Sequence, residues 1–243
     1  MCTLKEMAMI RKTVFGVILL TVLIAALSGS LKGRLCPFIT MAPKEATICE
    51  SLENRGVGNV VFDIQYPQIQ GFDDEAFEQR LNKRISMQVE NAKADALYQA
   101  KKDEDWIFVL HIYDEVKCKR GLLSVRVTND LDNGGTGFPN TVYYNADMQK
   151  SCYLTLDDLF VSKEYRKVID QLIRARIEKD EHYFTEEFKG VSECTSFFIS
   201  NRQLNISFAK YEIASGMTGE PDFAIPTVLI RKWLRPEYAQ LLW

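Results

Sequence analysis

Near its N-terminus the sequence contains a long apolar segment, residues 13–31, which has no charged side chain. As a helix rising about 1.5 Å per residue it would be about 28 Å long, close to the hydrocarbon thickness of a membrane, about 30 Å. Lys5, Arg11 and Lys12 precede it, which favours a cytoplasmic N-terminus. A buried core helix would instead carry polar side chains along one face.

This pattern predicts a cytoplasmic lead at 1–12, followed by a transmembrane anchor or a signal segment at 13–31. In the first case the protein spans the cell membrane once, with its C-terminal domain outside the cytoplasm. In the second case the segment is cleaved off and the rest of the protein is exported, for example to a periplasm. The sequence leaves both alternatives open, and in both the partner of residues 13–31 is a membrane.

Composition indicates a folded protein outside the membrane. Hydrophobic residues make up 47% of the chain and charged residues 26%, as in globular domains. A formal net charge of −3 provides no broad basic surface. We therefore expect no nucleic acid partner.

The cysteines beyond the apolar segment would lie where disulfides persist. One or two disulfides are expected, with no connectivity assigned; the alternative is that these residues are small buried hydrophobic side chains. Their spacing contains no CxxC pair and no zinc pattern, so we expect no metal site. The disulfide candidates are Cys36, Cys49, Cys118, Cys152 and Cys194.

The part of the chain up to residue 150 alternates strand and helix patterns. Residues 32–56 contain prolines and mixed polarity and are interpreted as a tether, and 57–150 as an N-terminal αβ subdomain. A strand is predicted from Val60, ended by Pro67. Asp73 or Asp74 would cap the next helix, which has an apolar position every three to four residues. Strands are then predicted at 106–113, 122–128 and 141–148, forming an antiparallel meander covered by the helix.

Residues 151–243 form the second predicted subdomain. A helical turn starts at Thr155, where Asp158 completes the form of a capping box. A second amphipathic helix follows, with an apolar stripe from Tyr165 to Ile177. Residues 197–200 and 204–209 are typical of a hairpin. The predicted class is α+β, an antiparallel sheet packed with two long amphipathic helices, preceded by one N-terminal transmembrane or signal helix.

Several segments, in this order and at these spacings, resemble a family of extracytoplasmic domains called domain of unknown function 3298. This family is known from the lysozyme-sensing anti-sigma-V factor. The segments are Gly134-Gly135 with Pro139-Asn140, Leu154 to Phe160, and Leu204 to Pro226 with its Tyr211-Glu212, Gly219 and Ile225-Pro226. Upstream, Ile64 to Ile69 resembles the family's usual N-terminal companion, domain of unknown function 4163. Together the resemblance covers roughly 57–243.

The resemblance implies a bacterial α+β domain outside the cytoplasm that binds a ligand. It implies lysozyme as a partner, while Ser215, Gly216 and Met217 depart from the Pro, Tyr and Ala common in relatives. The lead at 1–12 is too short for an anti-sigma domain, and a deacetylase domain is also missing.

The residues that carry chemistry in enzymes form no catalytic pattern in this chain. The sequence has two histidines, His111 and His182, and neither begins an HExxH motif. Adjacent Asp157 and Asp158 do not face each other across a substrate as glycosidase carboxylates do, so capping is the preferred interpretation. We therefore expect no enzyme activity, no catalytic residue and no cofactor.

Exposed loops are the best candidates for binding, because aromatic side chains there are good anchors for proteins or sugars. The candidates are Phe138, Tyr143, Tyr144, Tyr211, Glu212, Ser215 and Met217. The sequence thus predicts a non-catalytic binding or sensor domain of the bacterial envelope, for a lysozyme-like protein or peptidoglycan. The alternatives are an exported cell-wall hydrolase or deacetylase-related enzyme, and an envelope-assembly protein.

Overall fold

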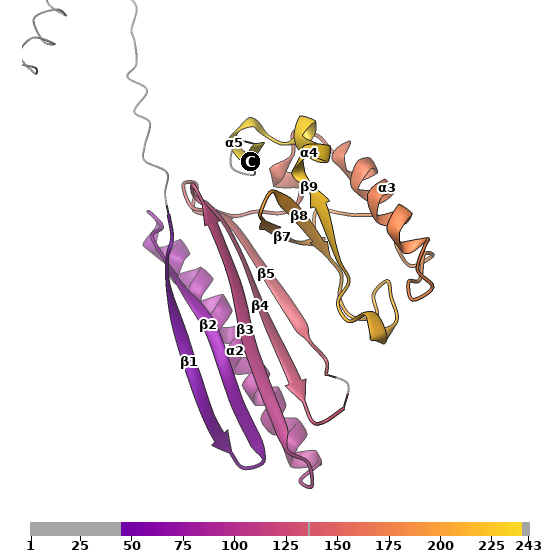
Figure 1. Cartoon of the computed structure of the whole chain (residues 1–243). Helices are drawn as coiled ribbons and strands as arrows, with labels where there is room; N and C mark the ends of the chain where they lie inside the picture. The colour runs from indigo at the N-terminus through magenta and orange to yellow at the C-terminus, as the bar shows by residue number, and fades with distance from the viewer. Residues whose placement is uncertain (1–44, 136, 240–243) are drawn as a thin grey trace, which may run out of the picture. The chain divides into compact units, whose positions relative to one another are not determined.

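A computed structural model describes residues 45–135 and 137–239 (Figure 1). The predicted lead, the apolar segment 13–31 and Cys36 lie outside these ranges. Within them, no helix combines the length and the apolar character needed to cross a membrane.

The first half of the described chain is a large sheet with one long helix, α2 (Figure 1). Among the described residues six strands follow one another in the order β1 to β6. Their bounds are β1 Thr47–Val57, β2 Val60–Gln70, β3 Phe108–Lys119, β4 Leu122–Asp132, β5 Asn140–Asp147 and β6 Cys152–Tyr153.

This sheet is mixed, which corrects the predicted antiparallel sheet. β2 and β3 pair in parallel, with Val60 beside Phe108 and Ile64 beside Ile112, whereas the other neighbours are antiparallel. The reason is α2, which runs between β2 and β3 and returns the chain to the end of the sheet where β2 started. A crossover of this kind is what a parallel pair requires. The coarser assignment to the α+β class is confirmed.

Two further predictions about this half were wrong. Residues 47–56, assigned to the tether, belong to strand β1 (Thr47–Val57), whose side chains are mostly exposed because it is an edge strand. An edge strand buries no full face, so its sequence lacks the alternation that marks a strand. Pro67 does not end β2, which continues to Gln70. The parallel pairing with β3 stops at Ile64, so at Pro67 that ladder requires no backbone N–H donor.

Helix α2, Glu75–Lys102, confirms the predicted cap and stripe. The Asp74 side chain accepts a hydrogen bond from the Phe77 backbone N–H at 3.0 Å. The buried positions of the helix face the sheet and fill the first core: Phe77, Leu81, Ile85, Val89, Ala92, Ala96 and Ala100.

The β3–β4 hairpin is longer than predicted. Residues 117–119, which lie between the two predicted strands, are the end of β3, and the turn is Arg120-Gly121 with both φ angles positive, 51° and 86°. Such a turn matches the twist of the flanking strands. At the other end, Trp106 and Ile107 precede the strand and are exposed.

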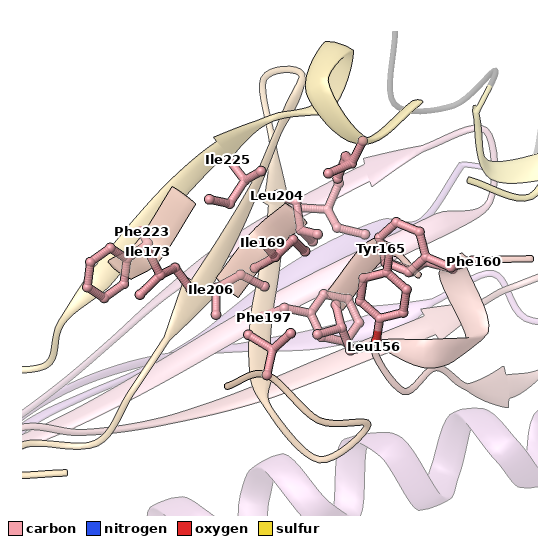
Figure 2. Close-up of a cluster of buried hydrophobic side chains, with 14 of the residues drawn as sticks. Leu156, Phe160, Tyr165, Ile169, Ile173, Phe197, Leu204, Ile206, Phe223 and Ile225 are labelled. Atoms are coloured by element: carbon pink, nitrogen blue, oxygen red, sulfur yellow. The ribbon is translucent and has the colours of Figure 1, made fainter. Parts of the chain in front are cut away.

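The second half contains a small antiparallel sheet and helix α3, Tyr165–Ile177. The strands are β7 Ser196–Ser200, β8 Gln203–Ser207 and β9 Asp222–Pro226, so the predicted hairpin is confirmed. Figure 2 shows the second core, where side chains of α3 meet those of the small sheet. Short elements complete this half: η1 Asp157–Leu159, η2 Gly216–Thr218, α4 Thr227–Ile230, η3 Arg231–Trp233 and α5 Pro236–Ala239.

A polar seam, formed by Ser124 and Asn145 on the large sheet and the backbone of β7, joins the two halves. The Ser124 hydroxyl accepts a hydrogen bond from Ile199 N–H at 2.9 Å and donates one to Asn145 Oδ1 at 2.5 Å. The Asn145 amide donates to the Phe197 carbonyl at 2.9 Å. Leu123 and Ala146, next along the strands, point to the α2 core, so the seam lies on the opposite face of the large sheet.

Candidate functional site

Two loops meet at one end of β5 and form what we call the aromatic loop cluster: Phe138, Lys210, Tyr211 and Met217. Phe138 lies between β4 and β5, and the other three lie between β8 and β9. Lys210 Nζ donates a hydrogen bond to the Gly137 carbonyl at 2.7 Å and thereby ties the loops together. The same ammonium lies 4.3 Å from the Phe138 ring centroid and 5.4 Å from that of Tyr211.

The apolar members of the cluster are exposed. The exposed fractions are 62% for Phe138, 53% for Tyr211 and 82% for Met217. The two rings are 6.2 Å apart between centroids, so they form one surface. Grouped apolar side chains on the surface of a soluble domain are characteristic of an interaction site.

Gly216 allows Tyr211 to pack on the loop that carries Met217. A Cβ atom at position 216 would lie 2.5 Å from the Tyr211 hydroxyl oxygen and 2.7 Å from Cζ of the ring. Tyr211 itself has a φ of +69°, a backbone conformation that is costly for a bulky side chain. The surrounding contacts therefore hold this aromatic ring in one place.

Glu220 fixes the second loop to β5. Its carboxylate accepts hydrogen bonds from the Thr141 backbone N–H at 2.9 Å and from the Thr141 hydroxyl at 2.5 Å. The Thr128 and Thr141 hydroxyl oxygens are 2.8 Å apart, which continues this network onto β4. The loops are thus positioned by a rigid sheet, as binding loops usually are.

An acidic segment lies against the cluster loop. Ser215 N–H donates to the His182 carbonyl and Phe184 N–H to the Ile213 carbonyl, both at 2.8 Å. Residues 182–184 therefore run beside 213–215. The exposed charged side chains on either side of them, within 178–187, are mainly carboxylates: Glu178, Asp180, Glu181, Glu186 and Glu187, with Lys179 as the one basic residue of this stretch.

The structure brings three of the seven predicted binding residues together in the exposed cluster and separates Tyr143 from Tyr144. Tyr143 is half-buried, and burial raises the pKa of its hydroxyl, which lies by Ser207. Tyr144 is buried on the opposite face, where burial raises its pKa to about 12 and its hydroxyl donates to Gln88 Oε1 at 2.9 Å. Successive strand residues point to opposite faces, so adjacent tyrosines cannot share one site.

The other two predicted residues shape the loop. Glu212 is exposed, and its carboxylate accepts a hydrogen bond from the Ala209 backbone N–H at 2.8 Å, closing a turn. Ser215 is half-buried, and its Oγ has no hydrogen-bond partner among the described residues. Sequence reasoning missed Lys210 and Glu220, which make contacts 73 and 79 residues away along the chain. No local pattern indicates such contacts.

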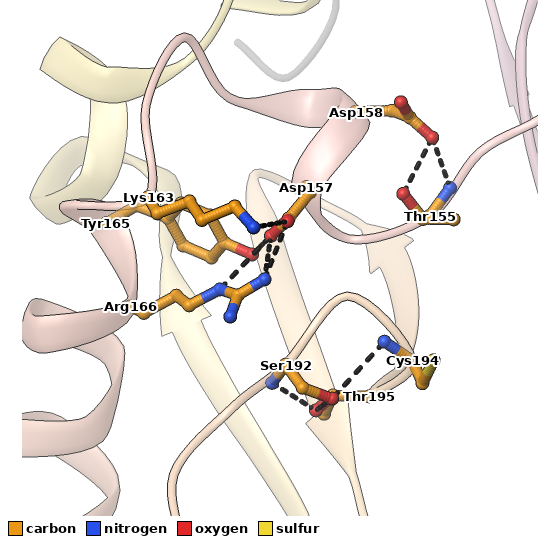
Figure 3. Close-up of polar contacts among 9 residues, drawn as sticks. All are labelled: Thr155, Asp157, Asp158, Lys163, Tyr165, Arg166, Ser192, Cys194 and Thr195. Carbon is orange, nitrogen blue, oxygen red and sulfur yellow. Dashed lines mark hydrogen bonds and ion pairs between the residues drawn. The ribbon is translucent and has the colours of Figure 1, made fainter.

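Asp157 and Asp158 hold separate structural contacts (Figure 3). Asp157 accepts bonds from the Tyr165 hydroxyl at 2.5 Å and from the Arg166 guanidinium at 2.6 Å. Burial alone would raise the pKa of Asp157, but the bonds from Arg166 and Tyr165 lower it below its usual value. Asp158 instead accepts from the backbone N–H and hydroxyl of Thr155, at 2.8 and 2.7 Å, and its own N–H bonds to the Thr155 carbonyl, so one of the two bonds of the predicted capping box is present.

A third carboxyl group, Asp114 on β3, lies in the space where β2 and β3 separate. Burial raises its pKa to about 7, with a further contribution from the nearby Glu50 carboxylate, while a hydrogen bond with Gln65 acts in the opposite direction. Among the described residues, Asp114 Oδ1 is buried without a hydrogen-bond partner.

The four described cysteines are free thiols, in contrast to the expected pairing. β2 lies between Cys49 on β1 and Cys118 on β3, and two strands lie between β3 and Cys152 on β6. Adjacent strands are about 4.8 Å apart, so these pairs exceed the Cα separation of about 7 Å that a disulfide spans. Cys194 is exposed in the turn after residue 191, shown in Figure 3. Within the described ranges no group of three His, Cys, Asp or Glu side chains is placed to hold a metal ion.

Comparison with known proteins agrees with this architecture. Residues 157–227 match the family "Protein of unknown function (DUF3298)", so the chain carries a DUF3298 domain that spans η1, α3 and the small sheet. Two crystal structures from this family have the same fold. One, from Bacteroides fragilis, has a TM-score of 0.54 and 16% identity and covers 82% of this chain and 97% of its own. The other, from Pseudomonas aeruginosa PAO1, has a TM-score of 0.52 and 16% identity and covers 80% and 96%.

A curated relative extends the similarity into the first half. The chain is 25% identical over 211 residues to the anti-sigma-V factor RsiV of Bacillus subtilis (strain 168). The match covers 82% of this chain and 73% of RsiV. The resemblance to an RsiV-like protein with a DUF3298 domain, stated from the sequence, is confirmed.

Proposed function

We propose that this protein is a non-catalytic binding module outside the cytoplasm of a bacterial cell, anchored to or exported across the membrane by residues 13–31. Its ligand is a basic protein of the lysozyme type. The observation that carries this proposal is the pair of exposed rings of Phe138 and Tyr211, 6.2 Å apart, packed on the loop that carries the exposed Met217. The similarity to RsiV supports the location.

The cluster has the features of a protein-binding anchor. Aromatic side chains contribute most to such interfaces when their positions are fixed before binding. Lys210 fixes both rings from within the cluster, and Gly216 seats Tyr211. Little side-chain freedom remains to be lost when a partner covers them.

The acidic segment at 178–187 favours a basic partner. Complementary charge at the rim of an interface increases the association rate and makes binding depend on salt. Lysozyme-type proteins are basic, so the charge and the aromatic anchors support the same ligand class.

The arrangement of carboxylates supports a role without catalysis. Asp157 is held by Arg166 and Tyr165, and Asp158 by Thr155, so neither is free to act on a substrate. A glycosidase needs two carboxyl groups that face each other across a sugar. Asp114 has a perturbed pKa, but it occupies the gap between two strands of the sheet.

The direct test is binding of the full chain to purified chicken-type lysozyme. The double variant Phe138→Ala/Tyr211→Ala should weaken binding by about 30-fold or more, because it removes both aromatic anchors. Raising the salt concentration should weaken binding by the wild type, because salt screens the charges of the acidic segment 178–187.

The matched control is Tyr98→Ala on α2. Tyr98 is 58% exposed and has Lys102 Nζ 4.2 Å from its ring centroid, so it reproduces the local chemistry of Tyr211 on a helix that is not part of the cluster. Binding by this variant should equal that of the wild type. Absence of lysozyme binding by the wild type, or equal losses in both variants, would exclude the proposed ligand or site. Retention on purified peptidoglycan, measured in parallel, tests the wall polymer as the ligand instead.

A further inference from the structure

A second concave site lies on the opposite face of β5, against helix α2. It is a groove of about 480 Å³ whose polar lining is Arg84, Gln88, Asn91 and Asp95 from the helix and Asn129 and Asn140 from the sheet. We call it the carboxamide groove. Its volume is in the range of about 300–1,000 Å³ found for small-molecule sites.

The groove replaces apolar core with amide side chains. On this face of β4, Leu123, Val125 and Val127 are buried in the first core, and the next position in the alternation is Asn129. Asn129 pairs across the strands with Asn140. Asn129 is half-buried and Asn140 is exposed, so the apolar row ends in amide groups that can face a ligand or water.

Gln88 and Tyr144 form a fixed floor. The Gln88 amide donates to the Val127 carbonyl at 2.9 Å and to Asn129 Oδ1 at 3.3 Å, while its oxygen accepts from the Tyr144 hydroxyl at 2.9 Å. The donor and acceptor ends of this side chain are therefore occupied. This network holds the Asn129 amide group in one orientation toward the groove.

The other polar groups of the groove are available to a ligand. The side chains of Asn91, Asp95 and Asn140 are exposed and make no hydrogen bond or ion pair with any other described residue. Carboxamides offer both donors and acceptors. Met87, Ala92 and Val142 supply apolar surface beside them.

Charge restricts the class of ligand. The charge of the one guanidinium, Arg84, equals and opposes that of the one carboxylate, Asp95, so the groove selects neither anions nor cations. A single carboxylate is also too few oxygen ligands for a hard metal ion. A neutral molecule with many hydroxyl groups uses donors and acceptors together and presents C–H surface to apolar side chains. We propose that the carboxamide groove binds a neutral saccharide.

The test is calorimetric titration of the full chain, in a detergent without a sugar head group, with two trisaccharides up to about 10 mM. One is the trimer of N-acetylglucosamine and the other is the trimer of glucose. Binding of either supports the proposal. Preference for the first would mean that acetamido groups are recognised by the carboxamides, and equal binding that hydroxyl groups alone are recognised.

The double variant Asn91→Ala/Asn140→Ala should weaken saccharide binding by about tenfold or more, because two hydrogen-bonding side chains are lost. Asn54→Ala on the exposed strand β1 is the matched control and should bind like the wild type. Circular dichroism checks that both variants are folded. No heat with either trisaccharide would overturn the proposal, as would undiminished binding by the double variant. A blocked tripeptide that binds where neither sugar does would also overturn it.

This site is independent of the proposed protein ligand. The variant Phe138→Ala/Tyr211→Ala should lose lysozyme and keep the saccharide, and Asn91→Ala/Asn140→Ala should do the reverse. The failure of one proposal therefore leaves the other standing.

Discussion

The two halves of the molecule use their helices differently. In the first half, the last three buried positions of α2 are alanines, Ala92, Ala96 and Ala100, and the carboxamide groove extends along the helix as far as the first of these turns, at Asn91 and Asp95. In the second half, α3 presents Tyr165, Ile169, Ile173 and Ile177 to the small sheet and ends on an isoleucine. The first half thus leaves a concave margin beside its helix, while α3 keeps bulky side chains along its whole buried stripe.

The seam between the halves is polar although both cores are apolar. Ser124 and Asn145 are 1% and 5% exposed, and they bind backbone atoms of β7. Buried hydrogen bonds of this kind fix relative position more than they add net stability. The comparison therefore indicates two cores held in one register by a few directed contacts.

The largest expected effect comes from removing apolar volume in each core. Leu81 in the first core and Ile169 in the second are both 0% exposed. The single variants Leu81→Ala and Ile169→Ala should each lose about 3 kcal/mol of unfolding free energy, since a cavity replaces close packing. Calorimetry should show a single transition that both variants shift downward, because the seam couples the halves. Two transitions, with each variant moving only one, would show that the halves unfold independently.

The seam itself should have the next largest effect. Asn145→Ala leaves the Phe197 carbonyl and the Ser124 hydroxyl without their buried partner, which should cost about 2 kcal/mol. Chemical unfolding measures the loss, and the exposed Asn54→Ala serves as its control. If the seam provides the coupling, the variant should also broaden or split the calorimetric transition. A loss equal to that of the control would mean that the seam does not join the halves.

Sequence reasoning succeeded where the signal is local. The stripe of α2, the Asp74 cap and the hairpin of β7 and β8 follow from the spacing of apolar residues and from capping chemistry. The parallel pairing of β2 with β3 could not be predicted in this way. The alternation of apolar and polar residues along a strand is the same whether its neighbour runs parallel or antiparallel to it.

The sites show the same limit. Phe138, Tyr211 and Met217 were found by residue type, but the fold decides which of them meet. Lys210 joins them through a contact across 73 residues, and Tyr144 turns away because of strand parity. The carboxamide groove was missed because its asparagines are scattered between residues 91 and 140 and are ordinary surface residues individually.

The ion pair of Asp157 with Arg166 tests how the second half stabilises a carboxylate. Their side chains are 18% and 25% exposed. Arg166→Met should cost about 1–2 kcal/mol, because Asp157 keeps its burial and loses its hydrogen-bonded cation, with the exposed Lys163 ammonium left at 3.6 Å. A lowered pKa adds stability above the ordinary aspartate value of 3.8 and loses it as pH falls through and below that value. The difference between variant and wild type should therefore be largest at neutral pH and shrink in acid.

The control for this pair is Arg80→Met, which removes an exposed guanidinium 3.8 Å from Asp74. An exposed pair of this kind contributes little, so its loss should be within about 0.5 kcal/mol. A pH-independent difference for Arg166→Met would indicate that the arginine acts through packing alone.

Asp114 is the counterpart of Asp157 in the first half and should give the smallest effect, with the opposite sign. It lies beside Glu50 and Gln65 instead of an arginine, and burial raises its pKa to about 7. A raised pKa means that the folded state holds the proton more tightly, so stability falls as pH rises from about 3.8 to about 7 and is level above that. Asp114→Asn removes this loss and should stabilise the protein at pH 8 by about 1 kcal/mol, a value reduced because the group is half-exposed.

The stability gained by Asp114→Asn should disappear in acid, and Glu50→Gln should lower the pKa of Asp114 in an NMR titration. If Asp114→Asn instead destabilises the protein at pH 8, the ionised carboxylate has a favourable partner. Both halves would then stabilise the ionised form of their buried carboxyl group.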